Sequence, residues 1–157
     1  MNDDDKYRAR YARMLQTFRT YTLQRCKSVT ARDWQKLVRL EAIESDGLVS
    51  CVTCDWRGSH KECDAGHFIP RRHSATLFDR RNCHVQCRPC NHHLAGNLSD
   101  YRRFMRDRYG IKTIRDLERL KSEVKQFTKE ELVHKRLWIR DRIKVLEESC
   151  ARDARVD

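Results

Sequence analysis

The sequence predicts a mostly helical α+β fold in which a small site on short strands has helical segments on both sides. Apolar residues recur at helical spacing near both ends of the chain, whereas cysteines, histidines and short β-like segments crowd between residues 48 and 97. Five glycines and two prolines among 157 residues are too few for a flexible linker. We therefore expect one compact domain with helical flanks.

The N-terminal part is expected to contain a basic segment followed by a helix. Residues 1–30 carry seven basic and three acidic side chains with scattered aromatic residues, and form either a helix that docks on DNA or a loose arm. The pattern Thr30-x-x-Asp33 is typical of a capping box, and an apolar helical stripe follows it up to Gly47.

The central segment, residues 31–110, is expected to be built largely on short elements. Strands are predicted over residues 48–52, 67–69 and 83–86. A short helix can begin at Pro89 and end near Gly96, and a further helix is expected to stop at Gly110.

The C-terminal segment, residues 111–157, is predicted to form a pair of helices. Capping-box patterns occur at Thr113-x-x-Asp116 and Thr128-x-x-Glu131. The second helix carries an apolar stripe that serves core packing or, alternatively, a dimer seam or a face for a protein partner. The stripe consists of Leu132, Ile139, Ile143 and Leu146.

The charge balance favours a polyanionic partner. The chain has 34 Lys and Arg residues against 23 Asp and Glu residues, a formal net charge of +11, and the excess is spread along the chain rather than held in one tail. Nucleic acid is the commonest polyanion in a cytosol, so we expect DNA as the partner. The alternative is a solvated basic surface.

The cellular compartment of the protein determines whether its cysteines form disulfides. No apolar run approaches the ~20 residues that a membrane span needs. The first five residues include three aspartates where a signal peptide would be basic and then apolar. We therefore expect a cytoplasmic protein without membrane contact, in which the eight cysteines stay reduced or bind metal.

Two cysteine pairs have the spacing of a structural zinc site. Cys51-x-x-Cys54 and Cys87-x-x-Cys90 can place four thiolates around one Zn²⁺. A site closed by four protein ligands stabilises the fold and does no chemistry. The cysteines outside this spacing are expected to be small buried hydrophobic residues; these are Cys26, Cys63, Cys83 and Cys150.

Polar residues between and after the cysteine pairs occur in an order that resembles the HNH endonucleases. His67 begins the apolar segment His67-Phe68-Ile69-Pro70, Asn82 precedes the next predicted strand, and Asn91 directly follows the second cysteine pair. The HNH resemblance implies a small ββα-metal finger, which is a hairpin followed by a helix, held together by the four-cysteine zinc knuckle.

A closer resemblance is to the phage NinG family, also called Rap, of recombination endonucleases that act on branched DNA. It covers roughly residues 32–147 and implies a phage protein in the host-cell cytoplasm. Longer family members carry an additional N-terminal cysteine cluster, whereas only Cys26 precedes the first pair here. The motifs that carry the resemblance are Asp64-Ala65-Gly66-His67, Arg81-Asn82-x-His84-x-Gln86-Cys87-x-x-Cys90-Asn91, Gly96-Asn97 and Tyr101-Arg102.

The resemblance implies hydrolysis of phosphodiester bonds with His67 as the general base. A neutral imidazole can take a proton from water near pH 7. Asn82 would fix and polarise this part of the site by hydrogen bonding, and His84 is a further catalytic candidate.

A hard divalent cation, Mg²⁺ or Mn²⁺, would neutralise charge on the scissile phosphate. Asp64 and Asn91 are its candidate ligands. The sequence departs from the common HNH pattern at Gly66, where an acidic or His ligand usually stands directly before the base. Asp64 can reach the ion if the strand bulges at Gly66.

Four arginines flank the site and are expected to grip phosphates, although each can also be a solvated charge; they are Arg71, Arg72, Arg80 and Arg81. The sequence thus favours a metal-dependent endonuclease for branched or structured DNA. The alternative, favoured by Gly66, is a non-catalytic zinc-knuckle module that binds nucleic acid. Symmetric cleavage of a four-way junction would suggest a homodimer.

Overall fold

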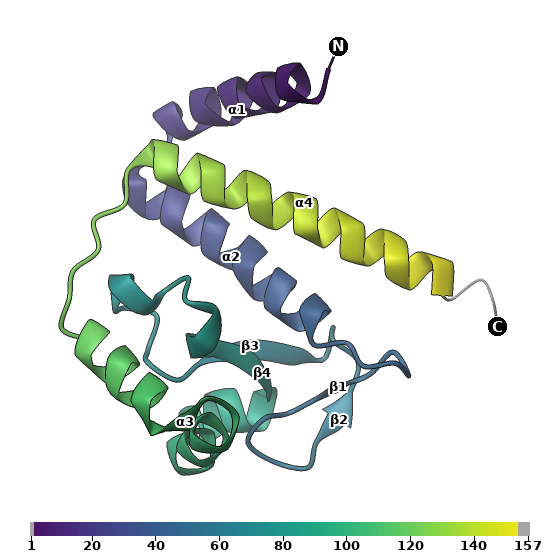
Figure 1. Cartoon of the computed structure of the whole chain (residues 1–157), viewed down its shortest axis with the longest axis vertical. Coiled ribbons are helices and arrows are strands. Elements are labelled where there is room, and N and C mark those ends of the chain that lie inside the picture. The colour runs from purple at the N-terminus through teal and green to yellow at the C-terminus, as the bar shows by residue number, and fades with distance from the viewer. Residues whose placement is uncertain (1, 154–157) are drawn as a thin grey trace. The chain divides into compact units, whose positions relative to one another are not determined.

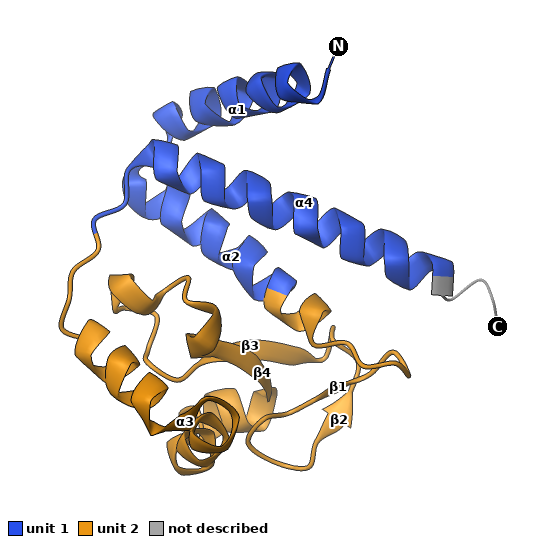
Figure 2. Ribbon diagram, in the orientation of Figure 1, with its two compact units in different colours: residues 1–37, 126–157 blue, residues 38–125 orange. Residues whose placement is uncertain are grey.

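The structure, a computed structural model, describes residues 2–153 and divides into two compact units (Figure 2). The helical unit comprises residues 1–37 and 126–157, and the central unit comprises residues 38–125. The three segments expected from the sequence, residues 1–30, 31–110 and 111–157, cut across these units, because both ends of the chain contribute to the helical unit. Residues 154–157 of the expected C-terminal segment lie outside the described residues.

The helical unit is built from α1 (Asp3–Thr20), most of α2 (Leu23–Glu41) and α4 (Lys129–Asp153), as Figure 1 shows. Helix α1 begins at a capping box between Asn2 and Asp5, in which each side chain accepts a hydrogen bond from the backbone N–H of the other. It packs against α4. Residues 3–20 therefore form a helix rather than a loose arm, and docking of this helix on DNA stays a prediction.

Helix α2 begins earlier than expected. Thr22 Oγ1 accepts a hydrogen bond from the Arg25 amide at 3.2 Å, about two turns before the predicted capping box. Thr30 lies inside the helix and donates its hydroxyl to the Cys26 carbonyl at 2.8 Å. The predicted box at Thr30 and Asp33 is wrong, because a threonine in a helix interior can satisfy its hydroxyl on the preceding turn.

Helix α4 begins as predicted. Thr128 N donates to Glu131 Oε2 at 2.8 Å, and Glu131 N donates to Thr128 Oγ1 at 3.1 Å, so this capping box is confirmed. Leu132, Ile139 and Ile143 of the expected stripe are buried in the structure. The stripe therefore contributes to a core.

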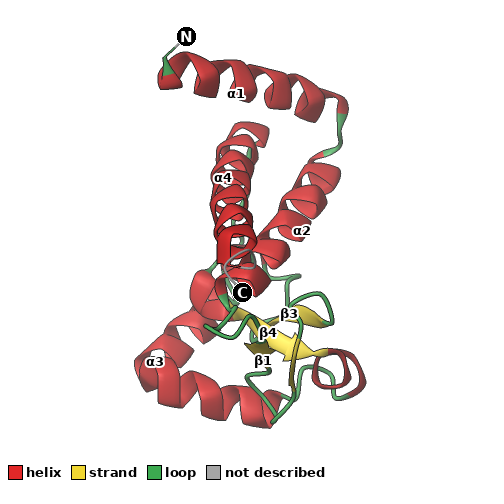
Figure 3. Ribbon diagram, turned by 90° about the vertical axis from the view of Figure 1, so that its right-hand side faces the viewer, coloured by secondary structure: helices red, strands yellow, loops and turns green. Residues whose placement is uncertain are grey.

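The central unit contains two small antiparallel sheets. Strand β1 (Val49–Ser50) pairs with β2 (Arg57–Gly58), and β3 (Cys63–His67) pairs with β4 (Cys83–Cys87). The hairpin of β3 and β4 is drawn in yellow in Figure 3.

The strand predicted over residues 67–69 is wrong, because β3 ends at His67 where that strand was expected to begin. Beyond His67, the amide of Phe68 donates to the backbone carbonyl of Asn82 at 2.9 Å, and the amide of Ile69 donates to its side chain at 2.7 Å. The chain therefore leaves the ladder immediately after His67.

Helical turns and one long helix complete the central unit. Two 3-10 turns, η1 (Ser74–Thr76) and η2 (Arg80–Asn82), lie in the connection between β3 and β4, and a π-helical turn, η3 (Pro89–His93), follows β4. Helix α3 (Leu98–Leu120) is broken at Gly110, whose φ of 78° lies outside the helical region, as the predicted stop requires.

The chain resumes helical structure directly after Gly110. The predicted capping box at Thr113 and Asp116 is wrong, since Thr113 Oγ1 instead donates to the Tyr109 carbonyl at 3.0 Å.

One core cluster of the central unit joins the loop after β3 to α3. It contains Phe68, Ile69, Tyr101, Met105, Ile114 and Leu117. The predicted mostly helical α+β class is confirmed. None of the described helices is both long and apolar enough to span a bilayer.

Candidate metal centre and candidate active site

The four predicted zinc cysteines lie together in the central unit. Their Sγ atoms all lie within 4.8 Å of one another, and the sulfurs of Cys54 and Cys87 are 3.6 Å apart. Four sulfurs around a zinc ion at 2.3 Å would be separated by roughly 3.8 Å. The cluster can therefore hold a metal ion such as zinc, with Cys51, Cys87 and Cys90 buried and Cys54 exposed.

Short elements bring these sulfurs together. Cys51 follows β1, Cys87 ends β4, and Cys90 lies in the η3 turn. Two backbone amides point at sulfurs, from Trp56 to Cys54 and from Cys90 to Cys87, both at 3.5 Å. Such amides stabilise thiolate charge, as a metal-binding turn requires.

His67 ends β3 and keeps a neutral ring near pH 7. Burial lowers its pKa, and the nearby Arg71 charge lowers it further, although the hydrogen bond to the Leu77 carbonyl acts in the opposite direction. That bond joins Nε2 to the carbonyl oxygen at 3.2 Å, so the proton of the neutral ring lies on Nε2. Nδ1 therefore carries the lone pair, and Cys83 Sγ lies 3.7 Å from it.

Asn82 is fully buried and holds the loop that follows His67. Its Oδ1 accepts from the Ile69 amide at 2.7 Å, while its Nδ2 donates to the carbonyls of Ile69 and Thr76 at 3.0 and 3.1 Å. Both ends of the amide are thus engaged with backbone. The hydrogen-bonding role expected for Asn82 is exerted on this loop.

His84 is buried and hydrogen-bonded at both ring nitrogens. Tyr101 donates its hydroxyl to the Gly66 carbonyl at 3.0 Å, so it must accept from His84 Nδ1, which lies 3.0 Å away. Nε2 then accepts from the Tyr109 hydroxyl at 2.8 Å. Burial, with the charges of Arg80 and Arg108, lowers the pKa of His84 to about 3. His84 therefore holds the Tyr101 hydroxyl in place, and Tyr101 in turn positions Gly66.

A second polar cluster surrounds Gly66, directly before His67. A β-carbon added there would lie 2.0 Å from Gln86 Oε1 and 3.1 Å from Asn91 Oδ1. Gln86 Oε1 is buried and has no hydrogen-bond partner among the described residues. Two amide oxygens therefore face the space that a side chain at Gly66 would fill.

The orientation of each amide is fixed by one partner that can only accept, the Gly96 carbonyl for Gln86 and the Asp64 carboxylate for Asn91. Gln86 Nε2 donates to the Gly96 carbonyl at 2.8 Å as well as to Thr53 Oγ1 at 3.0 Å. Asn91 Nδ2 donates to Asp64 Oδ2 at 3.1 Å. Turning either amide over would bring an oxygen against an oxygen, so the two carbonyl ends must point toward Gly66.

Asp64 adds a carboxylate to this cluster. It faces Gln86 across the hairpin in the β3–β4 register. Its Oδ2 also lies 2.8 Å from His92 Nε2, and its side chain is 31% exposed. Asp64 and Asn91, which were predicted as neighbours of one cation, are therefore in direct contact.

The four predicted phosphate-binding arginines fall into two pairs. Arg80 is held by Glu41 at 2.8 Å, and Arg81 by Asp79 and Asp116 at 2.6 and 2.9 Å. Arg71 and Arg72 are exposed, and no ion pair is found for either among the described residues. The second pair has free guanidinium groups.

Gln86 belongs to a motif that carries the family resemblance, but the sequence predicted no role for it at the site. It lies in a strand whose five residues are all buried, so a polar side chain there needs a specific reason. This reason can be recognised only when the strand is known to be buried on both faces, which the sequence alone does not show.

The fold and site define a class of protein: a mostly helical α+β chain whose β-hairpin leads into a four-cysteine cluster that can hold a metal ion such as zinc. Comparison with known families is more specific. Residues 3–149 match the family described as bacteriophage Lambda NinG protein, and the chain belongs to this family. The family predicted from the motifs is thereby confirmed.

Curated phage proteins share part of this sequence. The chain is 34% identical to Protein ninG of Salmonella phage P22 over 93 residues, which are 59% of this chain and 45% of that protein. For Protein ninG of Escherichia phage lambda, identity is 32% over 93 residues, again 59% and 45%. The matched segment thus spans less than half of these relatives. No solved structure matches the chain significantly.

Proposed function

We propose that this NinG-family protein is a metal-dependent DNA endonuclease of the HNH type, which hydrolyses phosphodiester bonds in branched or structured DNA during phage recombination. The observation that carries the proposal is a pair of amide oxygens, from Gln86 and Asn91, that face the space at Gly66. Gly66 is the residue directly before a neutral histidine. A nuclease needs oxygen donors for a cation and a base for the attacking water, and two neighbouring residues of β3 are associated with them: the donors face the side-chain position of Gly66, and His67 carries the base.

The donor set at Gly66 suits a hard divalent cation. Gln86 Oε1 is buried without a hydrogen-bond partner among the described residues, which is costly unless a ligand satisfies it, and Asn91 Oδ1 lies beside the same space. Oxygen ligands are those that Mg²⁺ and Mn²⁺ prefer. Gln86, Asn91 and Asp64 would hold the ion, which when bound supplies charge neutralisation at the scissile phosphate.

His67 would act as the general base through Nδ1. It is neutral near pH 7, and its Nδ1 lone pair, which the Cys83 thiol contacts at 3.7 Å, would take the proton of an attacking water that replaces this contact. The Nε2 hydrogen bond to the Leu77 carbonyl keeps the ring in place and favours the imidazolium that forms. Asn82 holds the following loop, and His84 with Tyr101 holds the Gly66 carbonyl, so both position the site.

DNA is the proposed substrate because of charge. The net charge of +11 attracts a polyanion, and the unpaired guanidinium groups of Arg71 and Arg72 lie four and five residues after His67 in the chain. Guanidinium groups bind phosphate oxygens in a bidentate manner. Arg80 and Arg81 would instead support the fold through their ion pairs.

A non-catalytic zinc module that binds nucleic acid is the second candidate. The observation that favours it is the four-cysteine cluster, which by itself can stabilise a nucleic-acid-binding fold without chemistry. It predicts DNA binding with no cleavage under any metal condition.

A cleavage assay separates the two candidates. Supercoiled plasmid, a four-way junction and a linear duplex of the same sequence would be incubated with the zinc-loaded chain in Mg²⁺, in Mn²⁺, without added divalent ion, and with EDTA. We expect cleavage with Mg²⁺ or Mn²⁺, preferentially of the junction, and none otherwise. Binding to all three DNAs without cleavage would establish the module instead.

The proposed ligand Asn91 supplies a finer test in the same assay. Asn91→Ala should lower cleavage, and excess Mn²⁺ should partly restore it, because a softer ion tolerates a poorer ligand set. His93→Ala, an exposed neighbour in the same turn, is the matched control and should retain activity. Loss of cleavage that no metal restores would place the role of Asn91 elsewhere than at the ion.

A further inference from the structure

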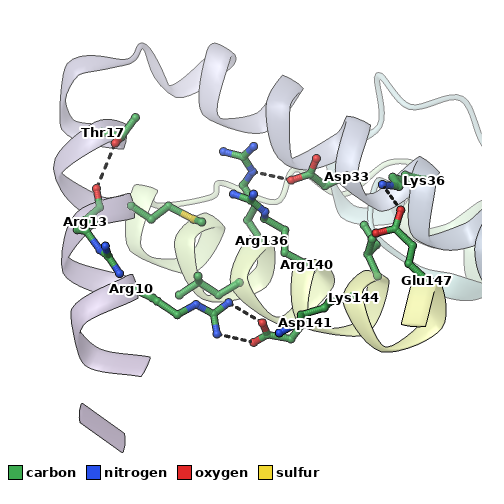
Figure 4. Close-up of a pocket in the computed structure, with 13 residues that line it drawn as sticks. Arg10, Arg13, Thr17, Asp33, Lys36, Arg136, Arg140, Asp141, Lys144 and Glu147 are labelled. Atoms are coloured by element: carbon green, nitrogen blue, oxygen red, sulfur yellow. Dashed lines mark hydrogen bonds and ion pairs between the residues drawn. The ribbon is translucent and has the colours of Figure 1, made fainter. Parts of the chain in front are cut away.

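The helical unit contains a groove that none of the proposed catalytic residues lines. Helices α1, α2 and α4 enclose a cavity of about 860 Å³, seen in close-up in Figure 4. Three of its lining residues are carboxylates, Asp33, Asp141 and Glu147. Six are cationic, namely Arg10, Arg13, Lys36, Arg136, Arg140 and Lys144.

Each carboxylate of the groove is already matched by one cation. Arg10 pairs with Asp141 at 2.5 Å, Lys36 with Glu147 at 2.6 Å, and Arg136 with Asp33 at 2.7 Å, as the dashed lines in Figure 4 mark. These pairs join α1 and α2 to α4. The remaining three cations of the groove are therefore in excess.

Two of the excess cations are free arginines. Arg13 on α1 and Arg140 on α4 are exposed, and neither guanidinium has an ion-pair partner among the described residues. Lys144 lies 3.7 Å from Glu148, a loose and solvent-exposed pair. Residues 1–37 and 126–157 together hold 17 of the 34 basic and 11 of the 23 acidic residues, so the unit as a whole is positive.

We propose that this groove binds the sugar–phosphate backbone of nucleic acid, with Arg13 and Arg140 as the phosphate-binding residues. Planar guanidinium groups match phosphate oxygens, and the ion pairs that brace the walls hold the groove ready before binding. The apolar side chains of Met14, Leu137 and Ile143 also line it, and a less polar surrounding strengthens contacts to charge. Backbone contacts of this kind give affinity without sequence preference.

The binding surface is independent of the proposed nuclease activity. Its residues belong to the helical unit, whereas the zinc cysteines and His67 belong to the central unit. An inactive protein can therefore still bind through the groove, and an active one can lack groove binding. A binding measurement without cleavage keeps the two proposals apart.

The test is DNA affinity in zinc-loaded protein with no added Mg²⁺ or Mn²⁺. Fluorescence anisotropy on a labelled 30-base-pair duplex would compare the wild type, Arg13→Gln/Arg140→Gln, and Arg8→Gln/Arg142→Gln. The control removes the same charge from the same two helices at exposed positions outside the groove. Arg13→Lys/Arg140→Lys retains the charge and serves as a second comparison.

We expect the Kd of the groove variant to rise roughly tenfold and its salt slope to fall by about two, since two phosphate contacts are lost. The control should stay within about twofold of the wild type, and the lysine variant should lie between. Equal losses in the groove variant and its control would overturn the proposal, because only the overall charge would then matter. Unchanged DNA affinity in the groove variant would also overturn it and leave an acidic protein segment as the occupant.

Discussion

A β-carbon on Gly66 would lie 2.0 Å from the amide oxygen of Gln86, so a side chain at position 66 would force the Gln86 amide to shift. The glycine stands in β3 where the HNH resemblance places an acidic or histidine ligand, and the glutamine reaches toward that space from β4. Under the proposed function, Gln86 Oε1 from β4 would supply the oxygen donor that a side chain at position 66 supplies in the HNH pattern.

Gly66→Ala should therefore destabilise the protein by about 1–3 kcal/mol, as overpacking of a closed site does. The new methyl group would displace a buried amide that is hydrogen-bonded to Thr53 and Gly96. A double-mutant cycle would measure this. Chemical denaturation would compare the wild type, Gly66→Ala, Gln86→Ala and the double variant. In the Gln86→Ala background the same alanine should cost little, and an equal cost in both backgrounds would contradict the contact.

The four-cysteine cluster predicts that metal and fold are lost together. Cys87→Ser should lose its bound zinc and unfold or aggregate, because the binding free energy of a structural zinc, roughly 10–16 kcal/mol in small domains, is folding free energy. Cys150, which was expected to be buried, is exposed on α4, so Cys150→Ser is the control and should keep both. Metal analysis and thermal melting give the readouts. A well-folded wild type without zinc would refute the prediction.

His84 should make the protein sensitive to acid. Its pKa is about 3 in the folded chain against 6.5 when free, so the unfolded state binds more protons between these values. Stability is then complete above pH 6.5 and falls as the pH drops toward 3, by up to roughly 4 kcal/mol.

Denaturation between pH 7 and pH 4 would check this against His84→Gln, which removes the titrating group. The variant should be less stable at pH 7 but show a flatter pH dependence. Identical slopes in both proteins would mean that His84 already takes up its proton in the folded state.

Capping boxes show how far local sequence predicts this fold. Thr128 and Glu131 form the box that their spacing indicates, whereas Thr30 and Asp33 have a similar spacing and do not. The difference is that α2 already begins after Thr22, so Thr30 lies in its interior. The spacing of two capping residues therefore does not by itself show at which residue a helix begins.

The candidate site divides in the same way. The four-cysteine cluster could be predicted, because each Cys-x-x-Cys pair is a pattern of neighbouring residues and two such pairs can bind one metal ion. The proximity of Gln86, Gly66 and Asn91 depends on the register of β3 and β4, and a shift of one residue would turn each side chain to the other face. The sequence predicted a strand over residues 67–69 instead, so the pairing of Gly66 with β4 was not part of that prediction.

The central claim is that His67 is the base of a metal-dependent nuclease, and its direct test is the cleavage rate of His67→Ala on a four-way junction. We expect a drop of ~10² to ~10⁴ with zinc content, folding and DNA affinity unchanged, because the ring is neither a zinc ligand nor a phosphate contact. His134→Ala, in the helical unit, should cleave at the wild-type rate. Cleavage by His67→Ala at the wild-type rate would contradict the account.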